Sequence, residues 1–285
     1  MKAFLDLAVP AITFLLLFAV GLDLAPADFA RVRRQPRVLA MGLLGPLIVL
    51  PPLALGLIAL FRPSPDLQAG LLLVAACPIG GISNTYSYLA GASTALSVTL
   101  TAVSSLLAVV TIPALTVLFE TALGRSMGFT APLPLIFAQL LLMLAVPVAI
   151  GMLVRSKRSA FASRSRPHFR ALGFGGVSLL ILSIVASDAA AFVHGLRNTA
   201  PLAAAFVAAS FLAGWLSGAV SGASRPDLFT LATEFATRNI AVATAIALTL
   251  AGRAEFAVFA TIYFLTEIPL MLCAIAVYRR SRPVA

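Results

Sequence analysis

The sequence predicts an all-α polytopic membrane protein with nine transmembrane helices in two inverted repeats, each with one helix broken at mid-membrane. Hydrophobic residues make up 61% of the 285 residues and charged residues only 11%, which is more apolar than a soluble domain of this length. The apolar residues form runs of about 20, the length of a membrane-spanning helix, without the alternation of a β-barrel strand. The basic residues lie mostly in short connections, as orientation signals do, so the net charge of +10 does not indicate a nucleic-acid partner.

Nine apolar runs bounded by charged residues, Pro or Gly are the predicted spans. They cover residues 4–23, 38–61, 67–90, 94–118, 132–154, 171–190, 200–221, 227–251 and 255–278. We expect the first run to be a retained span. It is too long for a signal peptide, and no small-residue cleavage pattern comes before the next charged segment.

The basic connections indicate the orientation of the chain. Counting spans places connections 24–37 and 155–170, Arg225 and the C-terminal tail on one side, with fourteen Lys and Arg residues against five on the other. The positive-inside rule puts the richer side in the cytoplasm. We therefore expect a multi-pass protein of the cell (inner) membrane with its N-terminus outside and its C-terminus in the cytoplasm.

Two of the nine spans are irregular at their middle. The third contains ACPIGGISN (76–84), where proline removes a helix donor and two glycines free the backbone. The eighth carries the polar run TEFATRN (233–239) at a similar depth without Pro or Gly, so its break is predicted from polarity alone. The two spans lie five apart and thus run in opposite directions, which is typical of an inverted-repeat secondary transporter.

Oxygen-bearing side chains gather around these breaks. Ser83 and Asn84 follow the first break, Ser97 and Thr101 lie four residues apart on one face of the fourth span, and Glu234 precedes the second break. Hydroxyl, amide and carboxylate oxygens are hard ligands suited to an alkali cation. The alternative for each Ser or Thr is ordinary helix packing, in which hydroxyl residues are common in membranes.

The second break also carries Thr237, Arg238 and Asn239. Glu234 and Arg238 stand at i and i+4, so a purely structural ion pair is one interpretation. Contact with an anionic substrate, or replacement of a bound cation, is the other. Glu267, beside Pro269 in the last span, is a second intramembrane carboxylate, either functional or simply hydrogen bonded.

The sequence offers no sign of an enzyme. It contains no HExxH motif, and His168 and His194 fall in predicted connections. Cys77 and Cys273 lie inside apolar runs as small hydrophobic residues, so neither a disulfide framework nor a cysteine metal site is expected.

These segments resemble the bile acid/sodium symporter family. ACPIGGISNTYSYLAGASTALSVTLTAVSSLLAVVTIP is similar to the family's CCPGG-x-x-SN segment and the YLA-x-G-x-x-ALSV segment after it, and EFATRNIAVA is similar to E-x-G-x-QN-x-x-LA. GLDLAPADFARVRRQP is similar to the family's GM-x-L-x-x-x-DF–basic–P segment near the N-terminus, so the resemblance covers nearly the whole chain. It implies a single transporter unit over 1–285 with a core domain (38–118 and 200–278), in which the two broken helices cross at mid-membrane. A panel domain (4–23 and 132–190) moves against this core.

The resemblance also implies ligands for two sodium ions. Carried over by position, the first ion is held by Ser83, Asn84, Ser97, Thr101 and Glu234, all with suitable side chains. The second relies on two glutamines, which fall on Pro46 and Arg238 in this chain. Since Arg carries only donors and cannot coordinate a cation, we expect one sodium site and the loss of the second.

The expected function is therefore secondary transport of a small organic anion by alternating access, coupled to one sodium ion. The alternative is sodium-independent or proton-coupled transport in which Arg238 replaces a sodium ion, with Arg238, Asn239, Thr237 and Glu267 as the residues that contact substrate or replace charge. An efflux carrier of related architecture, such as the auxin or arsenite carriers, is more distant. The expected partners are the anion and membrane lipids, with no obligate protein partner.

Overall fold

The computed structural model describes residues 2–23, 35–124, 138, 140–187 and 189–281, and regular structure in these ranges is helical. The helices follow the chain in the order α1 (Lys2–Asp23), α3 (Pro36–Phe61), α4 (Pro65–Ala76), α5 (Ser83–Ala90), α6 (Thr94–Leu123), the π-helix η2 (Leu141–Ala145), α8 (Val146–Lys157), α9 (Ser159–Ser187), α10 (Ala189–Val220), α11 (Arg225–Ala236), α12 (Ile240–Thr249) and α13 (Ala254–Arg280). This all-helical architecture agrees with the predicted fold class.

Within the described residues, four helices are long and apolar enough to cross a membrane by themselves. These segments are Pro36–Phe61, Thr94–Leu123, Gly195–Val220 and Glu255–Arg280. The predicted third and eighth spans do not qualify as single helices, because each is divided into two short ones, α4 with α5 and α11 with α12. The structure is thus that of a polytopic membrane protein, and the count of nine spans stays a prediction.

Two predicted connections are helical. Connection 155–170 is not a loop, because α8 continues to Lys157 and α9 begins at Ser159. Likewise α10 begins at Ala189, ahead of the predicted span 200–221. The apolar runs locate the membrane-embedded part of a helix, whereas a helix can continue past that part. The basic segment 24–34 and the start of the fifth span, 132–137, lie outside the described residues.

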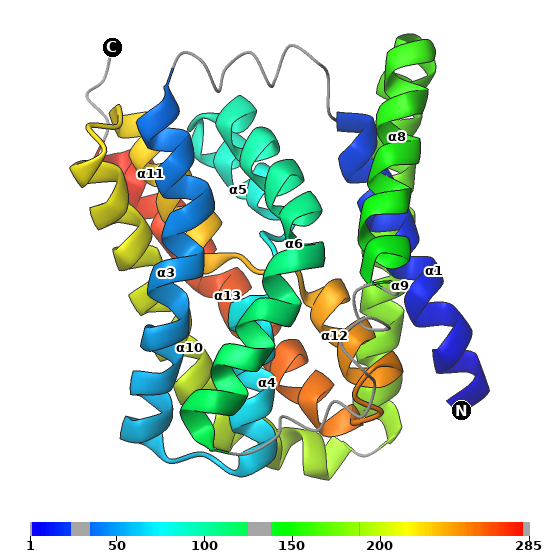
Figure 1. Cartoon of the computed structure of the whole chain (residues 1–285), viewed down its shortest axis with the longest axis vertical. Coiled ribbons are helices and arrows are strands. Elements are labelled where there is room, and N and C mark those ends of the chain that lie inside the picture. Colours follow the sequence, from blue (N-terminus) through cyan, green and yellow to red (C-terminus); the bar gives the residue numbers. More distant parts are fainter. Residues whose placement is uncertain (1, 24–34, 125–137, 139, 188, 282–285) are drawn as a thin grey trace.

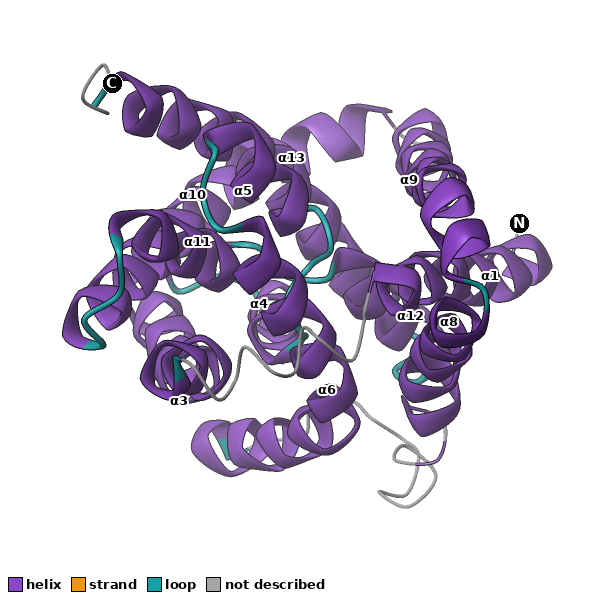
Figure 2. Ribbon diagram, turned by 90° about the horizontal axis from the view of Figure 1, so that it is seen from above, coloured by secondary structure: helices purple, strands orange, loops and turns teal. Residues whose placement is uncertain are grey.

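Helices α1, α8 and α9 pack against one another beside the remaining helices (Figures 1 and 2). Glycines let α1 and α8 approach closely. A Cβ atom on Gly21 would lie 2.2 Å from the Val148 carbonyl oxygen, and one on Gly151 would lie 2.4 Å from that of Phe18. Small residues at helix contacts are typical of membrane proteins.

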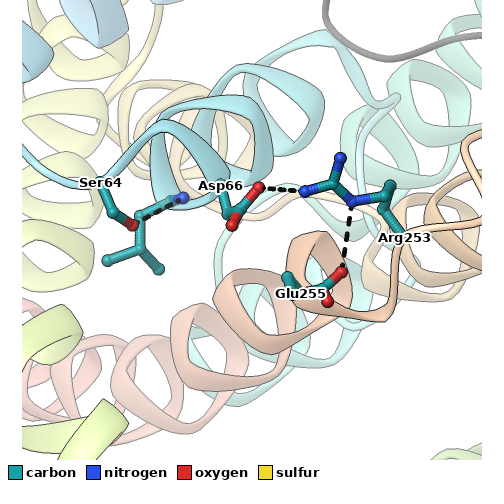
Figure 3. A network of polar contacts seen from close by, with 5 residues as sticks. Ser64, Asp66, Arg253 and Glu255 are labelled. Atoms are coloured by element: carbon teal, nitrogen blue, oxygen red, sulfur yellow. Dashed lines mark hydrogen bonds and ion pairs between the residues drawn. The ribbon is translucent and has the colours of Figure 1, made fainter.

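A polar contact at the lower end of Figure 1 joins the starts of α4 and α13. Arg253 donates to Asp66 at 2.6 Å and to Glu255 at 3.4 Å (Figure 3). The three side chains are 42–59% exposed, so the pairs contribute about 0–1 kcal/mol each to stability. Ser64 beside them caps α4 by accepting from the Leu67 amide.

The predicted topology can be tested at two exposed serines. Ser64 lies at the junction of α3 and α4 and Ser281 just after α13, at opposite ends of the molecule (Figure 1). With Cys273→Ser as background, Ser64→Cys is expected to react with an impermeant maleimide in intact cells. Ser281→Cys is expected to react only after permeabilisation. Labelling of both positions under the same condition would contradict the topology.

Candidate functional site

The two interrupted segments meet backbone to backbone. Ile79 and Arg238 form an isolated antiparallel bridge, in which the Gly80 amide donates to the Thr237 carbonyl at 3.1 Å and the Asn239 amide donates to the Pro78 carbonyl at 2.8 Å. Both predicted breaks are therefore present. The bridge gives partners to backbone groups that leave their helices, which a membrane interior requires.

The chain achieves this contact differently in the two segments. In the first, Gly80 permits the approach, since a Cβ atom there would lie 2.6 Å from the Arg238 carbonyl oxygen. In the second, α11 ends at Ala236, and Thr237 is already extended at φ −105° and ψ 110°. The Asn239 side chain then caps α12 by accepting from the Val242 amide at 3.2 Å.

Four helix ends face the crossing, and protein donors satisfy two of the carbonyls there. Helices α4 and α11 end at it, whereas α5 and α12 begin there. The Arg238 guanidinium donates to the Cys77 carbonyl at the end of α4. The Tyr263 hydroxyl donates to the Ala236 carbonyl at the end of α11. Negative helix ends attract cations and positive ends attract anions, so both kinds of ligand find a complementary helix end here.

The five predicted ligand side chains form one buried cluster. Ser97 Oγ lies 2.5 Å from Glu234 Oε1 and 2.7 Å from Asn84 Oδ1, and Thr101 Oγ1 lies 3.3 Å from Glu234 Oε2 and 3.4 Å from Asn84 Oδ1. Each hydroxyl has one hydrogen to donate, so two donors face these four acceptor contacts. Ser83 Oγ lies 3.4 Å from Ser97 Oγ and 3.3 Å from Thr101 Oγ1. None of the five residues is more than 4% exposed.

Of the two interpretations of Glu234 and Arg238, the structural ion pair is not what the structure shows. Among the residues that the structure describes, no ion pair joins them, and the guanidinium donates to the Cys77 carbonyl instead. The i, i+4 relation requires a continuous helix, and α11 ends between the two residues. Glu234 is thus a fully buried carboxylate that faces hydroxyl donors and has no cation in direct contact within the described ranges.

Arg238 lies between two pockets. The larger, about 50 Å³, is bounded by α1, α9, α13 and both breaks, and its lining includes Arg238, Asn239, Arg170, Gly81 and Phe264. The smaller, about 10 Å³, brings Arg238 together with Pro46 of α3 and with Ser104 of α6. Arg238 is 3% exposed, and its Nε and Nη1 atoms have no hydrogen-bond partner in the described part of the chain.

Thr237 and Glu267 lie apart from the larger pocket. Neither lines it, although both are fully buried. The Thr237 hydroxyl and the Tyr86 hydroxyl are the polar side-chain neighbours of the Glu267 carboxylate. The sequence analysis did not identify Tyr86, Arg170 or Tyr263 as site residues. Of the three, only Tyr86 could have been suspected, because it follows Asn84 by two residues. Ser104 accepts from the Ile79 amide at 3.1 Å, so it supports the break.

Comparison with known proteins gives a consistent result. The model of the sodium bile acid symporter family matches residues 10–195. A Bacillus subtilis protein named as a sodium-dependent transporter, YocS, is 30% identical over 59% of this chain and 52% of its own length. An Oryza sativa chloroplast protein named as a sodium/metabolite cotransporter, BASS2, is 30% identical over 74% of this chain and 49% of its own. The Arabidopsis thaliana BASS1 protein, named as a probable sodium/metabolite cotransporter of the chloroplast, is 25% identical over 94% of this chain and 65% of its own length. The chain spans about half the length of the first two relatives.

Proposed function

The chain belongs to the sodium bile acid symporter family, and from this premise we propose that it is a secondary transporter that moves a small organic anion coupled to one sodium ion. The family consists of transporters and not of enzymes. The observation that carries the proposal is the buried cluster of oxygen atoms at the crossing of the two interrupted helices.

The cluster is suited to one sodium ion. Its five side chains supply hydroxyl, amide and carboxylate oxygens, which are the ligands that hard cations take. Neighbouring oxygens in the cluster are 2.5–3.4 Å apart, so small movements would let them surround an ion. Glu234 is fully buried without an ion-pair partner among the described residues. A buried charge is costly unless it is compensated, and a bound sodium ion supplies that compensation.

The larger pocket is suited to an organic anion. Arg238 and Arg170 contribute positive charge to its lining, while Leu16, Val20 and Phe264 contribute apolar surface. The N-termini of α5 and α12 face the crossing beside it, and helix N-termini favour anions. Arg238 has two N–H groups available for a carboxylate, and such contacts are stronger than neutral ones.

The arrangement of helices supports alternating access. The pocket lies between α1 and α9 on one side and the two breaks on the other, so a movement of α1, α8 and α9 against the remaining helices would open it. These groups correspond to the proposed panel (4–23 and 132–190) and core (38–118 and 200–278). We also propose that the chain has nine membrane spans in two inverted repeats and lies in the cell inner membrane.

The alternative is sodium-independent or proton-coupled transport, and the contacts of Arg238 are compatible with it as well. Arg238 donates to the Cys77 carbonyl at the end of α4 and shares the smaller pocket with Pro46. This places a permanent positive charge at a negative helix end, where a bound cation would otherwise be stabilised. Arg238 therefore replaces one cation in either version, and the versions differ only in whether the Glu234 cluster binds sodium.

The experiment that tests the proposal measures sodium binding and sodium-driven uptake. Purified protein is expected to melt at a higher temperature in sodium chloride than in potassium chloride of equal ionic strength, because a ligand that binds only the folded state stabilises it. Proteoliposomes with an inward sodium gradient are then screened with labelled small organic acids. Sodium stabilisation without uptake of any anion would contradict the transport proposal, and uptake without sodium stabilisation would favour the alternative.

A matched pair of threonines on α6 tests the ligand assignment. Thr101→Val removes a proposed ligand hydroxyl and is expected to weaken sodium binding about tenfold or more, since a polar contact to a charge contributes about 1.5–3 kcal/mol. Thr99→Val is the control, because the Thr99 hydroxyl is equally buried but donates to the Ala95 carbonyl of its own helix. Sodium titrations of the melting temperature provide the measurement. Equal effects of the two substitutions would remove Thr101 from the site.

A further inference from the structure

A second buried carboxylate, Glu267 on α13, has no role in the function proposed above. It is fully buried, and neither of its oxygens meets a donor in regular hydrogen-bond geometry within the described residues. The hydroxyls of Tyr86 and Thr237 lie near enough to interact with the carboxylate, although neither reaches that geometry. Buried polar groups are normally hydrogen bonded, so this group of unpartnered oxygens needs an explanation.

The charges around Glu267 come from few side chains. Among the described residues, the titratable or charged groups that face it are Tyr86 from α5, Arg238 from the second break and Tyr263 from α13 itself. Helices α4, α10, α11 and α12 also pack against α13, and none of their described side chains adds a charge that acts on Glu267. Arg238 is thus the one positive charge near Glu267, although the two form no ion pair.

The net charge of the buried groups suggests when Glu267 would bind a proton. Glu234, Glu267 and Arg238 are each 3% exposed or less. With sodium at the Glu234 cluster, the three side chains and the ion have no net charge. An anion on Arg238 then leaves one negative charge without compensation, and such a charge is costly in a low-dielectric interior.

We propose that Glu267 is a proton-binding site of the transport cycle, whose carboxylate takes up one proton when the anion binds beside Arg238 and gives it up when the anion leaves. The proton comes from water on the side from which the anion enters, forms an O–H bond with one carboxylate oxygen, and returns to water on the other side. A sodium ion would need several oxygens around a cavity, and Glu267 lines neither of the two pockets described above. A proton needs one oxygen only.

The inference rests on the proposed anion transport, but its test requires no identified substrate. The chain contains four glutamates, Glu120, Glu234, Glu255 and Glu267, so glutamate labelled with ¹³C at the side-chain carboxyl gives few NMR signals. The labelled full chain in detergent micelles is titrated with acid and base, and Glu267→Gln identifies the signal of interest. If that variant does not fold, E120Q, E234Q and E255Q assign the remaining signal by elimination.

The Glu267 signal is expected to change from ionised to protonated within the pH range over which the protein stays folded. A bound anion would neutralise the positive charge of Arg238, and Arg238→Gln removes that charge. Without it the ionised carboxylate of Glu267 is less favourable, so the midpoint of its titration is expected to move to higher pH. The signals of Glu120 and Glu255 should not respond to that substitution. A Glu267 that is ionised throughout, protonated throughout, or indifferent to Arg238→Gln would overturn the inference.

Sodium stabilisation of the melting temperature separates this inference from the function on which it rests. Glu267→Gln, or Tyr86→Phe where the first variant does not fold, is expected to keep the sodium response of the unmodified protein. Loss of the sodium response with Glu267→Gln would show that Glu267 belongs to the sodium site and would overturn a separate proton site. An unmodified protein that lacks the sodium response while Glu267 titrates would refute only the sodium proposal.

Discussion

Glu234→Gln is expected to abolish sodium-dependent stabilisation of the protein and to leave the sodium-free protein at least as stable as before. Glu234 is fully buried and has hydroxyl donors but no ion-pair partner among the described residues. Without sodium its charge is therefore a cost, which the amide removes. With sodium, loss of the carboxylate leaves the ion unpaired in the interior. Such a loss costs about 3–5 kcal/mol, or about two orders of magnitude or more in affinity.

The opposite signs of the two effects make this prediction specific. A carboxylate with a merely structural role would lower the melting temperature in sodium and in potassium alike when it is replaced. Asn84→Ala is expected to weaken the sodium response in the same way, because its Oδ1 accepts from Ser97 and Thr101 in the same cluster. Glu255→Gln is the control, since that carboxylate is exposed in the contact with Arg253. A Glu234→Gln protein with an unchanged sodium response would remove Glu234 from the site.

The cluster could be predicted because its parts follow local rules. Ser97 and Thr101 share a face of one continuous helix, α6, so their spacing alone places both hydroxyls together. The break before Ser83 follows from Pro78 and Gly80, which a helix interior does not favour. The sequence pattern did not indicate that the two segments would join through a backbone bridge between Ile79 and Arg238. That contact is tertiary, and only the resemblance to a known family suggested it.

Two interpretations of the sequence differ from the structure. A Glu234–Arg238 pair one helical turn apart requires a helix through residue 238, whereas α11 ends at Ala236. Segment 155–170 is predicted as a connection because its charges end an apolar run, yet α8 extends to Lys157 and α9 covers the rest. Side-chain polarity shows where an apolar run ends, but it does not report the backbone hydrogen bonds that end a helix.

Two neighbourhoods could not be inferred from spacing at all. Tyr86 on α5 lies near Glu267 on α13, almost two hundred residues later in the chain. Pro46 and Arg238 line the same small pocket, as the carried-over second ion site predicts. In the first case no local pattern links the residues. In the second, only the resemblance suggested the link, and the loss of an ion site there stays a prediction.

The second large effect is expected at Arg238. Its guanidinium occupies the region where Pro46 and the end of α4 meet, so the unmodified protein should bind sodium at one site with a Hill coefficient near one. Arg238→Gln is expected to weaken binding of the anion found in the uptake screen about tenfold or more, because charge-assisted contacts contribute about 1.5–3 kcal/mol. The variant should still respond to sodium, because the Glu234 cluster does not contain Arg238.

Melting temperature and anion affinity, measured on the same preparation of Arg238→Gln, distinguish the two roles of this residue. If Arg238 only supports the fold, the Cys77 carbonyl loses its donor, so the protein loses thermal stability while the remaining folded fraction binds the anion normally. If Arg238 binds the anion, affinity falls in a protein that still folds.

Arg238→Gln alone should not restore a second sodium site, because Pro46 offers no side-chain oxygen in that pocket. The double substitution Pro46→Gln with Arg238→Gln supplies two amide oxygens and is expected to raise the sodium Hill coefficient above one. A clearly sigmoidal sodium dependence in the unmodified protein would contradict the assignment of Arg238 as the replacement for an ion.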